Sequence, residues 1–185
     1  MRPIRPIAVL MLLLLQASVL AAQDRRLGER LDPGTAAAVQ RLVDSAHATG
    51  LPTEPLVQKA LEGKTMGASA ERIQEAVGAL LDRLVHARDA LGPDAGQAEL
   101  TAGASALRAG LAPASLRQLH ALRTGSSLAV PISVLTDLVV QGLPPDEATR
   151  EVLDLARNGR SDDEFVALRR RMEERLRTTD SGAPP

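Results

Sequence analysis

A Gly-Leu-Pro signal recurs along this chain and restricts it to helices joined by short turns. It occurs as GLP at Gly50, as GLAP at Gly110 and as GLPP at Gly142. Glycine can adopt the left-handed conformation just past a helix end, and the leucine after it can fold back onto the last turn. The proline that follows stops the first helix and suits the start of another. We therefore predict that each signal joins two consecutive helices.

Between the joints, apolar residues are spaced as in helices. They recur at intervals of three and four residues, for example at Ile73, Val77, Leu80 and Leu84, which places them in one stripe along a helix. No segment alternates apolar and polar residues between turn signals, so no strand is expected. The pattern predicts eight helices, at 33–49, 53–62, 69–91, 97–109, 113–124, 131–141, 145–158 and 162–177.

The assignment of two of these helices depends on specific residues. The stretch VPISVLTDLVVQG is rich in β-branched residues, but Pro131 suits a first helical turn, Asp137 would interrupt a buried strand and Gly142 supplies a stop. We therefore assign it to a short, largely buried helix. The last helix follows an Asn-Gly stop, and Ser161 with Glu164 three residues later forms the pattern of a capping box.

The fold class expected is all-α, with about eight short to medium helices joined by Gly/Pro turns in a helical bundle or a short irregular helical-repeat stack. The three glycine-bounded segments differ in length, with separations of 13, 15 and 17 residues, so a strict repeat is not expected and a bundle is slightly favoured. Residues 23–177 are predicted to form a single domain, and residues 178–185 a disordered tail.

The first 22 residues have the three parts of a secretory signal peptide. Arg2 and Arg5 precede nine uninterrupted apolar residues, Ile7 to Leu15, and small residues follow as far as Ala22. A retained membrane anchor is the alternative, but Gln16 breaks an apolar stretch that falls short of the roughly 20 residues of a spanning helix. We expect cleavage after Ala21 or Ala22 and a periplasmic or secreted protein without a stable membrane span.

Composition excludes several classes of function. Cleavage would leave 20 basic and 23 acidic residues, which argues against nucleic acid as a partner. The chain has no cysteine, so neither a disulfide framework nor lipid attachment through cysteine is expected. Phe165 is the single aromatic residue, whereas single-stranded nucleic-acid sites stack bases on aromatic rings.

The three histidines do not form a recognisable catalytic or metal-binding pattern. His47, His86 and His120 lie on three different predicted helices. Asp44 precedes His47 by three residues, and Asp89 follows His86 by three, so each carboxylate could orient a base or complete half of a metal site. Pairing on an exposed helix surface explains both spacings more simply. No metal and no cofactor are predicted.

Other candidate residues are explained by helix chemistry. Glu54 and Glu62 flank a short helix and could be imagined as acid and base, but carboxylates near helix ends more often act as caps or solvated charges. The segment QKALEGKT ends like a phosphate-binding loop, yet Gln58 stands where the first glycine belongs and the preceding segment reads as a helix. Lys64 is interpreted as a charge near a helix end. The catalytic residues, if any exist, are unknown.

The function expected is therefore protein–protein interaction in the cell envelope, by a non-catalytic assembly component or a holdase-like chaperone. The alternative is a helical cell-envelope hydrolase that uses a glutamate. The lack of a convergent polar cluster in the sequence argues against the enzyme, and the partner and the oligomeric state are left open.

Overall fold

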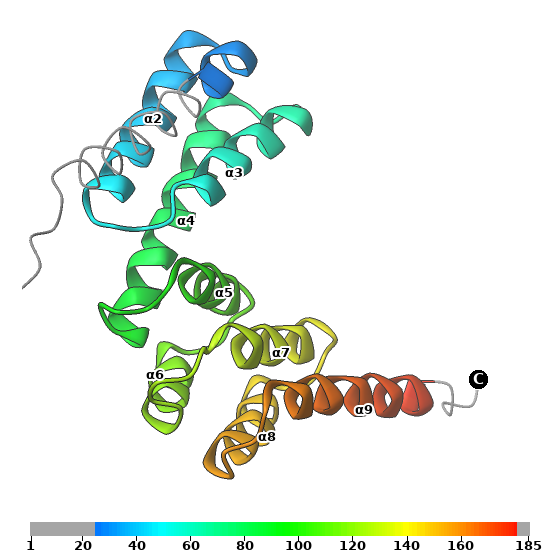
Figure 1. Cartoon of the computed structure of the whole chain (residues 1–185). Helices are drawn as coiled ribbons and strands as arrows, with labels where there is room; N and C mark the ends of the chain where they lie inside the picture. The colour runs from blue at the N-terminus through cyan, green and yellow to red at the C-terminus, as the bar shows by residue number, and fades with distance from the viewer. Residues whose placement is uncertain (1–24, 181–185) are drawn as a thin grey trace, which may run out of the picture. The chain divides into compact units, whose positions relative to one another are not determined.

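The structure is a computed structural model that describes residues 25–180. The predicted signal peptide, its cleavage site and residues 181–185 of the predicted tail lie outside these residues. The described chain is all-α, as predicted, and residues 25–180 contain no strand (Figure 1). Its labelled helices are α2 (Pro33–Ala48), α3 (Glu54–Thr65), α4 (Ala70–Leu91), α5 (Gln97–Arg108), α6 (Pro113–Leu122), α7 (Ala129–Val140), α8 (Pro145–Arg157) and α9 (Asp162–Asp180).

The three predicted joints have the expected backbone geometry. Gly50, Gly110 and Gly142 are left-handed, with φ of 71°, 94° and 101°. The leucine after each glycine is buried, and its N–H donates to the carbonyl five residues earlier at 2.9 to 3.1 Å. Each glycine N–H donates to the carbonyl three residues earlier. This is the Schellman arrangement, which satisfies the last carbonyls of a helix and turns the chain.

Several helix ends differ from the predicted ones. Helix α3 continues through Gly63 and stops before Gly67, because Gly67 is the residue that turns left-handed, with φ of 72°. Helix α6 ends two residues early, α7 begins two residues early, and α9 extends three residues past the predicted end at 177. Residues 25–30 are also helical, which the sequence pattern did not suggest. Leu27 in that segment is buried, so tertiary packing stabilises a segment whose own helical signal is weak.

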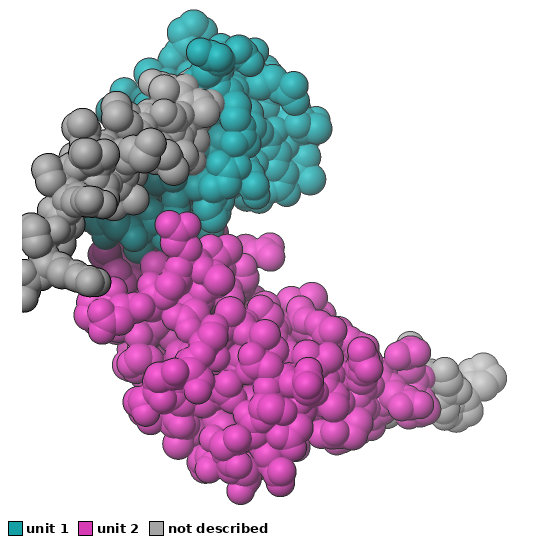
Figure 2. Space-filling view, viewed as in Figure 1, with its two compact units in different colours: residues 1–81 teal, residues 82–185 magenta. Residues whose placement is uncertain are grey.

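The chain divides into two compact units, residues 1–81 and residues 82–185, coloured separately in Figure 2. Helix α4 contributes its first half to unit 1 and its second half to unit 2. The single domain predicted over 23–177 stays a prediction. Within residues 25–180, no helix has both the length and the apolar character needed to cross a bilayer.

In unit 1, the residues buried between the helices are mainly aliphatic. Helices α2 and α3 pack together, and Gly63 on α3 lies so close to Ile73 on α4 that an added Cβ would meet Ile73 Cγ1 at 2.9 Å. The helical segment 25–30 is linked to α3 by Arg26, whose Nη1 donates to both carboxylate oxygens of Glu54 at 2.9 and 3.1 Å. The buried apolar residues include Leu27, Leu31, Val39, Val43, Leu51, Leu56, Val57, Ile73 and Val77.

In unit 2, the helices form a stack of hairpins, which is one of the two arrangements that the sequence left open. Helix α7 packs between α5 and α9, while α6 packs against α8 (Figure 1). The first residues of α5 and α7 are 32 positions apart, those of α6 and α8 are also 32 apart, and those of α7 and α9 are 33 apart. Unit 2 therefore repeats a two-helix element, a pattern that the glycine separations alone did not reveal.

Side-chain bonds fix the direction of the repeated helices. The Glu99 carboxylate near the start of α5 accepts the N–H of Leu128, just before α7, at 2.7 Å. Arg169 on α9 donates to Asp137 on α7 at 2.8 Å, and Gln141 donates to Glu173 at 2.9 Å. Because these last two pairs share a constant offset of 32 residues, α7 and α9 run parallel. The core between the helices includes the fully buried Phe165.

Candidate functional site

The histidines that were considered as catalytic or metal-binding residues are dispersed. His47 lies on α2, His86 on α4 and His120 on α6, and all three side chains are exposed. Asp44 accepts a hydrogen bond from Gln40 Nε2 at 2.9 Å. Asp89 is exposed one turn from His86. Across residues 25–180, no three histidine or acidic side chains gather so that they could hold a metal ion.

The two glutamates considered as an acid–base pair serve separate surface contacts. Glu54 accepts from Arg26 and from Gln58 Nε2, the latter at 3.2 Å. Glu62 pairs with Lys59 Nζ at 2.8 Å. Eight residues of helix separate the two carboxylates, which corresponds to about 12 Å along the axis. They therefore do not converge on one substrate position. Lys64 is exposed in the last turn of α3, so QKALEGKT is helix and not a loop that could cradle phosphate.

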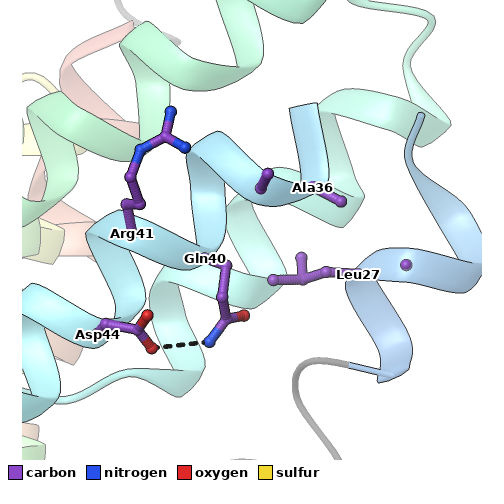
Figure 3. A pocket seen from close by; sticks show the side chains of 7 residues that line it. Leu27, Ala36, Gln40, Arg41 and Asp44 are labelled. Atoms are coloured by element: carbon purple, nitrogen blue, oxygen red, sulfur yellow. Dashed lines mark hydrogen bonds between the residues drawn. The ribbon is translucent and has the colours of Figure 1, made fainter. Parts of the chain in front are cut away.

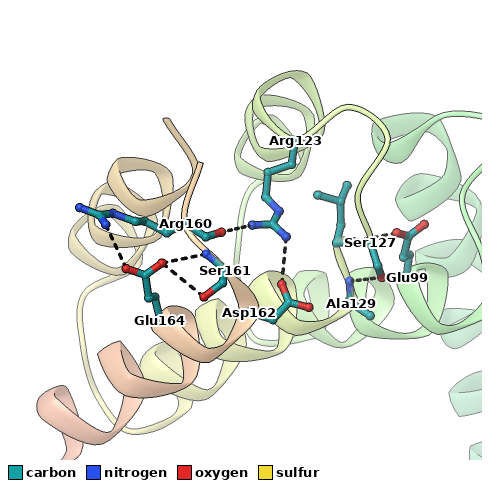
Figure 4. Close-up of polar contacts among 9 residues, drawn as sticks. Glu99, Arg123, Ser127, Ala129, Arg160, Ser161, Asp162 and Glu164 are labelled. Atoms are coloured by element: carbon teal, nitrogen blue, oxygen red, sulfur yellow. Dashed lines mark hydrogen bonds and ion pairs between the residues drawn. The ribbon is translucent and has the colours of Figure 1, made fainter. Parts of the chain in front are cut away.

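A polar cluster that joins residues far apart in the sequence surrounds Arg123, at the end of α6. Its Nη1 donates to the carbonyl of Arg160 at 2.6 Å, and its Nη2 donates to Asp162 Oδ1 at 2.9 Å (Figure 4). The guanidinium carbon lies 5.0 Å from the centroid of the Phe165 ring, within the range of a cation–π contact. The Arg123 side chain is 11% exposed. This cluster fastens the start of α9 to the end of α6.

Sequence reasoning missed Arg123 but identified its neighbour, the capping box. The Ser161 N–H donates to Glu164 Oε2 at 2.9 Å, as a capping box requires (Figure 4). Nothing in the sequence distinguishes Arg123 from other arginines near helix ends, because its partners lie 37 to 42 residues away. Glu99 was missed for the same reason: it accepts the Gly96 N–H at 2.9 Å and also reaches Leu128.

A cavity of about 210 Å³ lies between these two polar centres in unit 2. Its lining includes His120, Asp94, Glu99 and Arg123. The last two side chains are held by the backbone and side-chain bonds described above, so they cannot turn toward a ligand without breaking those bonds. The exposed imidazole of His120, the exposed carboxylate of Asp94 and the hydroxyl of Ser126, which also lines the cavity, are left. No hydrogen bond joins any two of these three side chains within the described residues, so a nucleophile, its base and an electrophilic stabiliser are not assembled there.

A larger recess, of about 430 Å³, lies in unit 1 between the segment 25–30 and α2 (Figure 3). Small side chains form much of its wall, and Gln40 and Asp44 face each other across their hydrogen bond at its rim (Figure 3). The lining residues are Leu27, Gly28, Ala36, Ala37, Gln40, Arg41 and Asp44. These residues lack the converging donors or acceptors that fix a small-molecule ligand.

The ionisable groups with displaced pKa values serve helix starts and helix packing. Hydrogen bonding to Thr35, whose backbone N–H donates to Asp32 Oδ1 at 2.9 Å, lowers the pKa of Asp32, the N-cap of α2. The pKa of Glu71 is lowered by its own backbone N–H and then by the Ser69 hydroxyl. The hydrogen bond to Asp137 raises the pKa of Arg169. None of these groups lines the two cavities, so no catalytic tuning is visible there.

The surface of unit 2 offers a different kind of site. On α7, Val130, Ser133, Asp137 and Val140 form one stripe that reaches solvent or is half-buried, and the other half-buried residues of the helix are Ala129 and Val139. The residues 32 positions earlier form the matching stripe on α5, and Val166, Arg169 and Glu173 border it on α9. We call this surface the odd-helix face; its residues are Ala98, Thr101, Ser105, Arg108, Val130, Ser133, Asp137, Val140, Val166, Arg169, Arg170 and Glu173.

Val140 sets the odd-helix face apart from the other side of the stack. It is 70% exposed although valine is apolar, and α7 as a whole is the most apolar of the labelled helices. On α8, by contrast, the exposed stripe consists of charged residues only, namely Asp146, Arg150, Asp154 and Arg157. The odd-helix face differs in that it combines apolar, small and charged side chains around Val140, a mixed composition that protein interfaces also have.

Comparison with known protein families, with curated proteins and with solved structures finds no match for this chain.

Proposed function

We propose that this chain is exported to the cell envelope and acts there by binding another protein, as an assembly component or a holdase-like chaperone. The observation that carries the proposal is the odd-helix face, with Val140 70% exposed in the middle helix of the stack. Stacked helical hairpins generally bind partners along an extended surface built from equivalent helices. The face has half-buried neighbours on either side that can exclude water from a contact made at its centre.

The catalytic alternative receives no specific support. The glutamates on which it depended, Glu54 and Glu62, form separate surface pairs. Arg123, the most buried of the paired arginines in the described residues, is engaged by Arg160, Asp162 and Phe165. The proposal therefore depends on a surface instead of on a cluster of reactive groups.

Site-specific photocrosslinking in the native cell envelope tests the proposal. A photoreactive residue placed at Ser133, at the centre of the odd-helix face, should capture a protein in defined stoichiometry. The matched control is the same photoreactive residue at Arg150, an exposed position on α8. Equal capture from both positions, or none from Ser133, contradicts binding through this face. The enzyme would be favoured if growth that depends on this chain is restored by the wild type but is lost only with Glu54→Ala or Glu62→Ala.

Export has its own test. The sequence pattern predicts that protein recovered from the periplasm or the medium begins at Ala22 or Gln23. Intact mass spectrometry measures this directly. Recovery of the full-length chain in the membrane fraction contradicts cleavage.

A further inference from the structure

We propose that Asn158, just past the end of α8, is a site of spontaneous covalent modification, in which attack by the backbone nitrogen of Gly159 converts its side-chain amide to a carboxylate. The products weaken the contact that fastens α9 to α6, so unit 2 loses stability as a molecule ages. The proposal is independent of the proposed function, because the reaction needs only two neighbouring residues of this chain and water.

The pair Asn158–Gly159 has the features that this reaction requires. Asn158 is the only asparagine of the chain, and glycine follows it directly. Both residues are exposed. The side chain of the following residue normally hinders attack on the asparagine amide, but glycine has none, and even a Cβ built on Gly159 would meet no atom within 4 Å. Solvent therefore reaches the pair, and no neighbouring atom blocks the approach.

The reaction proceeds in two steps and involves no oxidation or reduction. The Gly159 nitrogen loses its proton to solvent and bonds to Asn158 Cγ, while the Cγ–Nδ2 bond breaks and Nδ2 takes up a proton and leaves as ammonia. Water then adds to one of the two carbonyl carbons of the cyclic imide, and the bond from that carbon to nitrogen breaks. The products are aspartate and isoaspartate. In isoaspartate the main chain also passes through Cβ and is therefore longer.

The joint between α8 and α9 restrains both reacting groups. The Gly159 N–H donates to the carbonyl of Ala156 at 3.0 Å, and Asn158 Nδ2 donates to the carbonyl of Asp154 at 2.7 Å. The nitrogen can attack Cγ only after the first bond opens and the amide turns away from the second acceptor. Local opening of a helix end requires less free energy than global unfolding, so the reaction is slowed in the folded chain but not prevented.

Arg123 opposes this opening from α6. Its Nη1 donates to the carbonyl of Arg160, the residue after Gly159, at 2.6 Å, and its Nη2 donates to Asp162 at 2.9 Å (Figure 4). The guanidinium also rests on the ring of Phe165. Hydrogen bonds from a charged donor are stronger than neutral ones, so these contacts hold the chain immediately after the reacting pair. Arg123 is therefore a positioning residue that slows the modification.

The products of the reaction weaken the same joint. A carboxylate at position 158 cannot donate to the carbonyl of Asp154, and it adds negative charge at the C-terminal end of α8, where the helix dipole disfavours it. Isoaspartate in addition lengthens the main chain before Arg160, whose carbonyl Arg123 holds. Isoaspartate should therefore disturb the link between α6 and α9 more than aspartate does.

Incubation of the purified full chain in mildly alkaline buffer, followed by peptide mass spectrometry, tests the site. The gain in mass that accompanies conversion of an amide to a carboxyl group should accumulate at residue 158, and fragmentation should detect isoaspartate there. Asn158→Gln should show no gain at this position, because its longer side chain would have to close a larger and less favourable ring. A folded chain that gains no mass at residue 158 overturns the proposal.

The restraint by Arg123 is tested by the rate of modification. Arg123→Ala should speed the reaction of the folded chain about ten-fold, as expected for the loss of hydrogen bonds from a charged group. Arg117→Ala, which removes an exposed arginine from the same helix, is the matched control and should leave the rate unchanged. In urea, the wild type and both variants should react at one common rate that exceeds that of the folded wild type. Equal rates for folded wild type and Arg123→Ala overturn the restraint.

Unfolding in urea tests the loss of stability. Asn158→Asp carries the new charge without the longer main chain, so its midpoint should lie below that of the wild type. The isoaspartate form, separated by ion exchange, should unfold at a still lower urea concentration. Equal midpoints for the isoaspartate form and the wild type overturn the effect on the link between α6 and α9.

Discussion

The helices of the two units are held together by different kinds of contact. Unit 1 packs leucine, valine, isoleucine and alanine, and its one described ion pair between separate helical elements is Arg26 with Glu54. Unit 2 repeats a two-helix element and fixes each repeat with polar contacts from Glu99, Arg123 and Arg169. The difference indicates that aliphatic burial is enough to assemble helices, whereas a stack in register needs directional bonds as well.

The largest expected effect is the loss of unfolding free energy when a core side chain of either unit is truncated. Phe165→Ala in unit 2 should lower the free energy of unfolding by about 3–5 kcal/mol, because it removes the one buried ring and the surface on which Arg123 rests. Leu56→Ala in unit 1 should cost about 2–5 kcal/mol through the lost aliphatic volume alone. Urea unfolding followed by circular dichroism measures both. A smaller loss for Phe165→Ala than for Leu56→Ala contradicts the special role of the ring.

The next comparison concerns glycines at which two helices approach closely, one in each unit. A Cβ on Gly103 would lie 2.9 Å from Ala87 Cβ, an atom fixed to the α4 backbone, so Gly103→Ala should destabilise by about 1–3 kcal/mol. At Gly63 the obstacle is Ile73 Cγ1, and a rotamer change can relieve it at about 0.5–1.5 kcal/mol.

Gly78→Ala provides the control for both substitutions. No atom lies within 4 Å of a Cβ added there, so alanine should stabilise the helix by about 0.4–1 kcal/mol. Thermal melts rank the three variants. Equal losses at Gly103 and Gly63 mean that unit 1 is packed as rigidly as unit 2.

The joints should behave alike in both units. Gly50→Val and Gly142→Val each force a β-branched residue into a left-handed backbone, at a cost of about 1–2 kcal/mol. The space around each Cβ position is open, so strain in the backbone is the expected cause. Matched shifts of the melting midpoint support one shared joint. An unchanged midpoint for either variant shows that its joint tolerates another conformation.

The smallest expected effect is a loss of stability at low pH. Asp32 and Glu71, both in unit 1, have pKa values lowered from 3.8 and 4.5. A lowered folded-state pKa means that the stabilisation is complete above the unfolded value and is lost as the pH falls through the folded value. Unit 1 should therefore lose stability below about pH 4. Arg169 in unit 2, whose pKa is raised, keeps its charge throughout that range.

Asp32→Asn tests the acid effect, because asparagine also caps helices but does not titrate. The variant should reduce the difference between urea midpoints at pH 7 and pH 3. A difference as large as that of the wild type assigns the acid sensitivity to other groups.

The sequence predicted the parts of the fold that local chemistry determines. The Pro145 start of α8 and the left-handed glycines at 50, 110 and 142 follow from properties of one or two residues. The stop at Gly67 was missed because Gly63 offered the same local signal and only packing against Ile73 distinguishes them. The polar cluster of Arg123 depends on partners far along the chain, for which one sequence holds no visible signal.

The 32-residue register of unit 2 also has a kinetic consequence. Each helix of the stack meets partners one or two helices away in the chain, so the loops that folding must close are short and of similar length. Low contact order of this kind is typical of domains that fold in microseconds to milliseconds. Folding can begin at any hairpin and spread to its neighbours. A chain that folds this quickly must be held unfolded if it is to cross a membrane as an extended polypeptide.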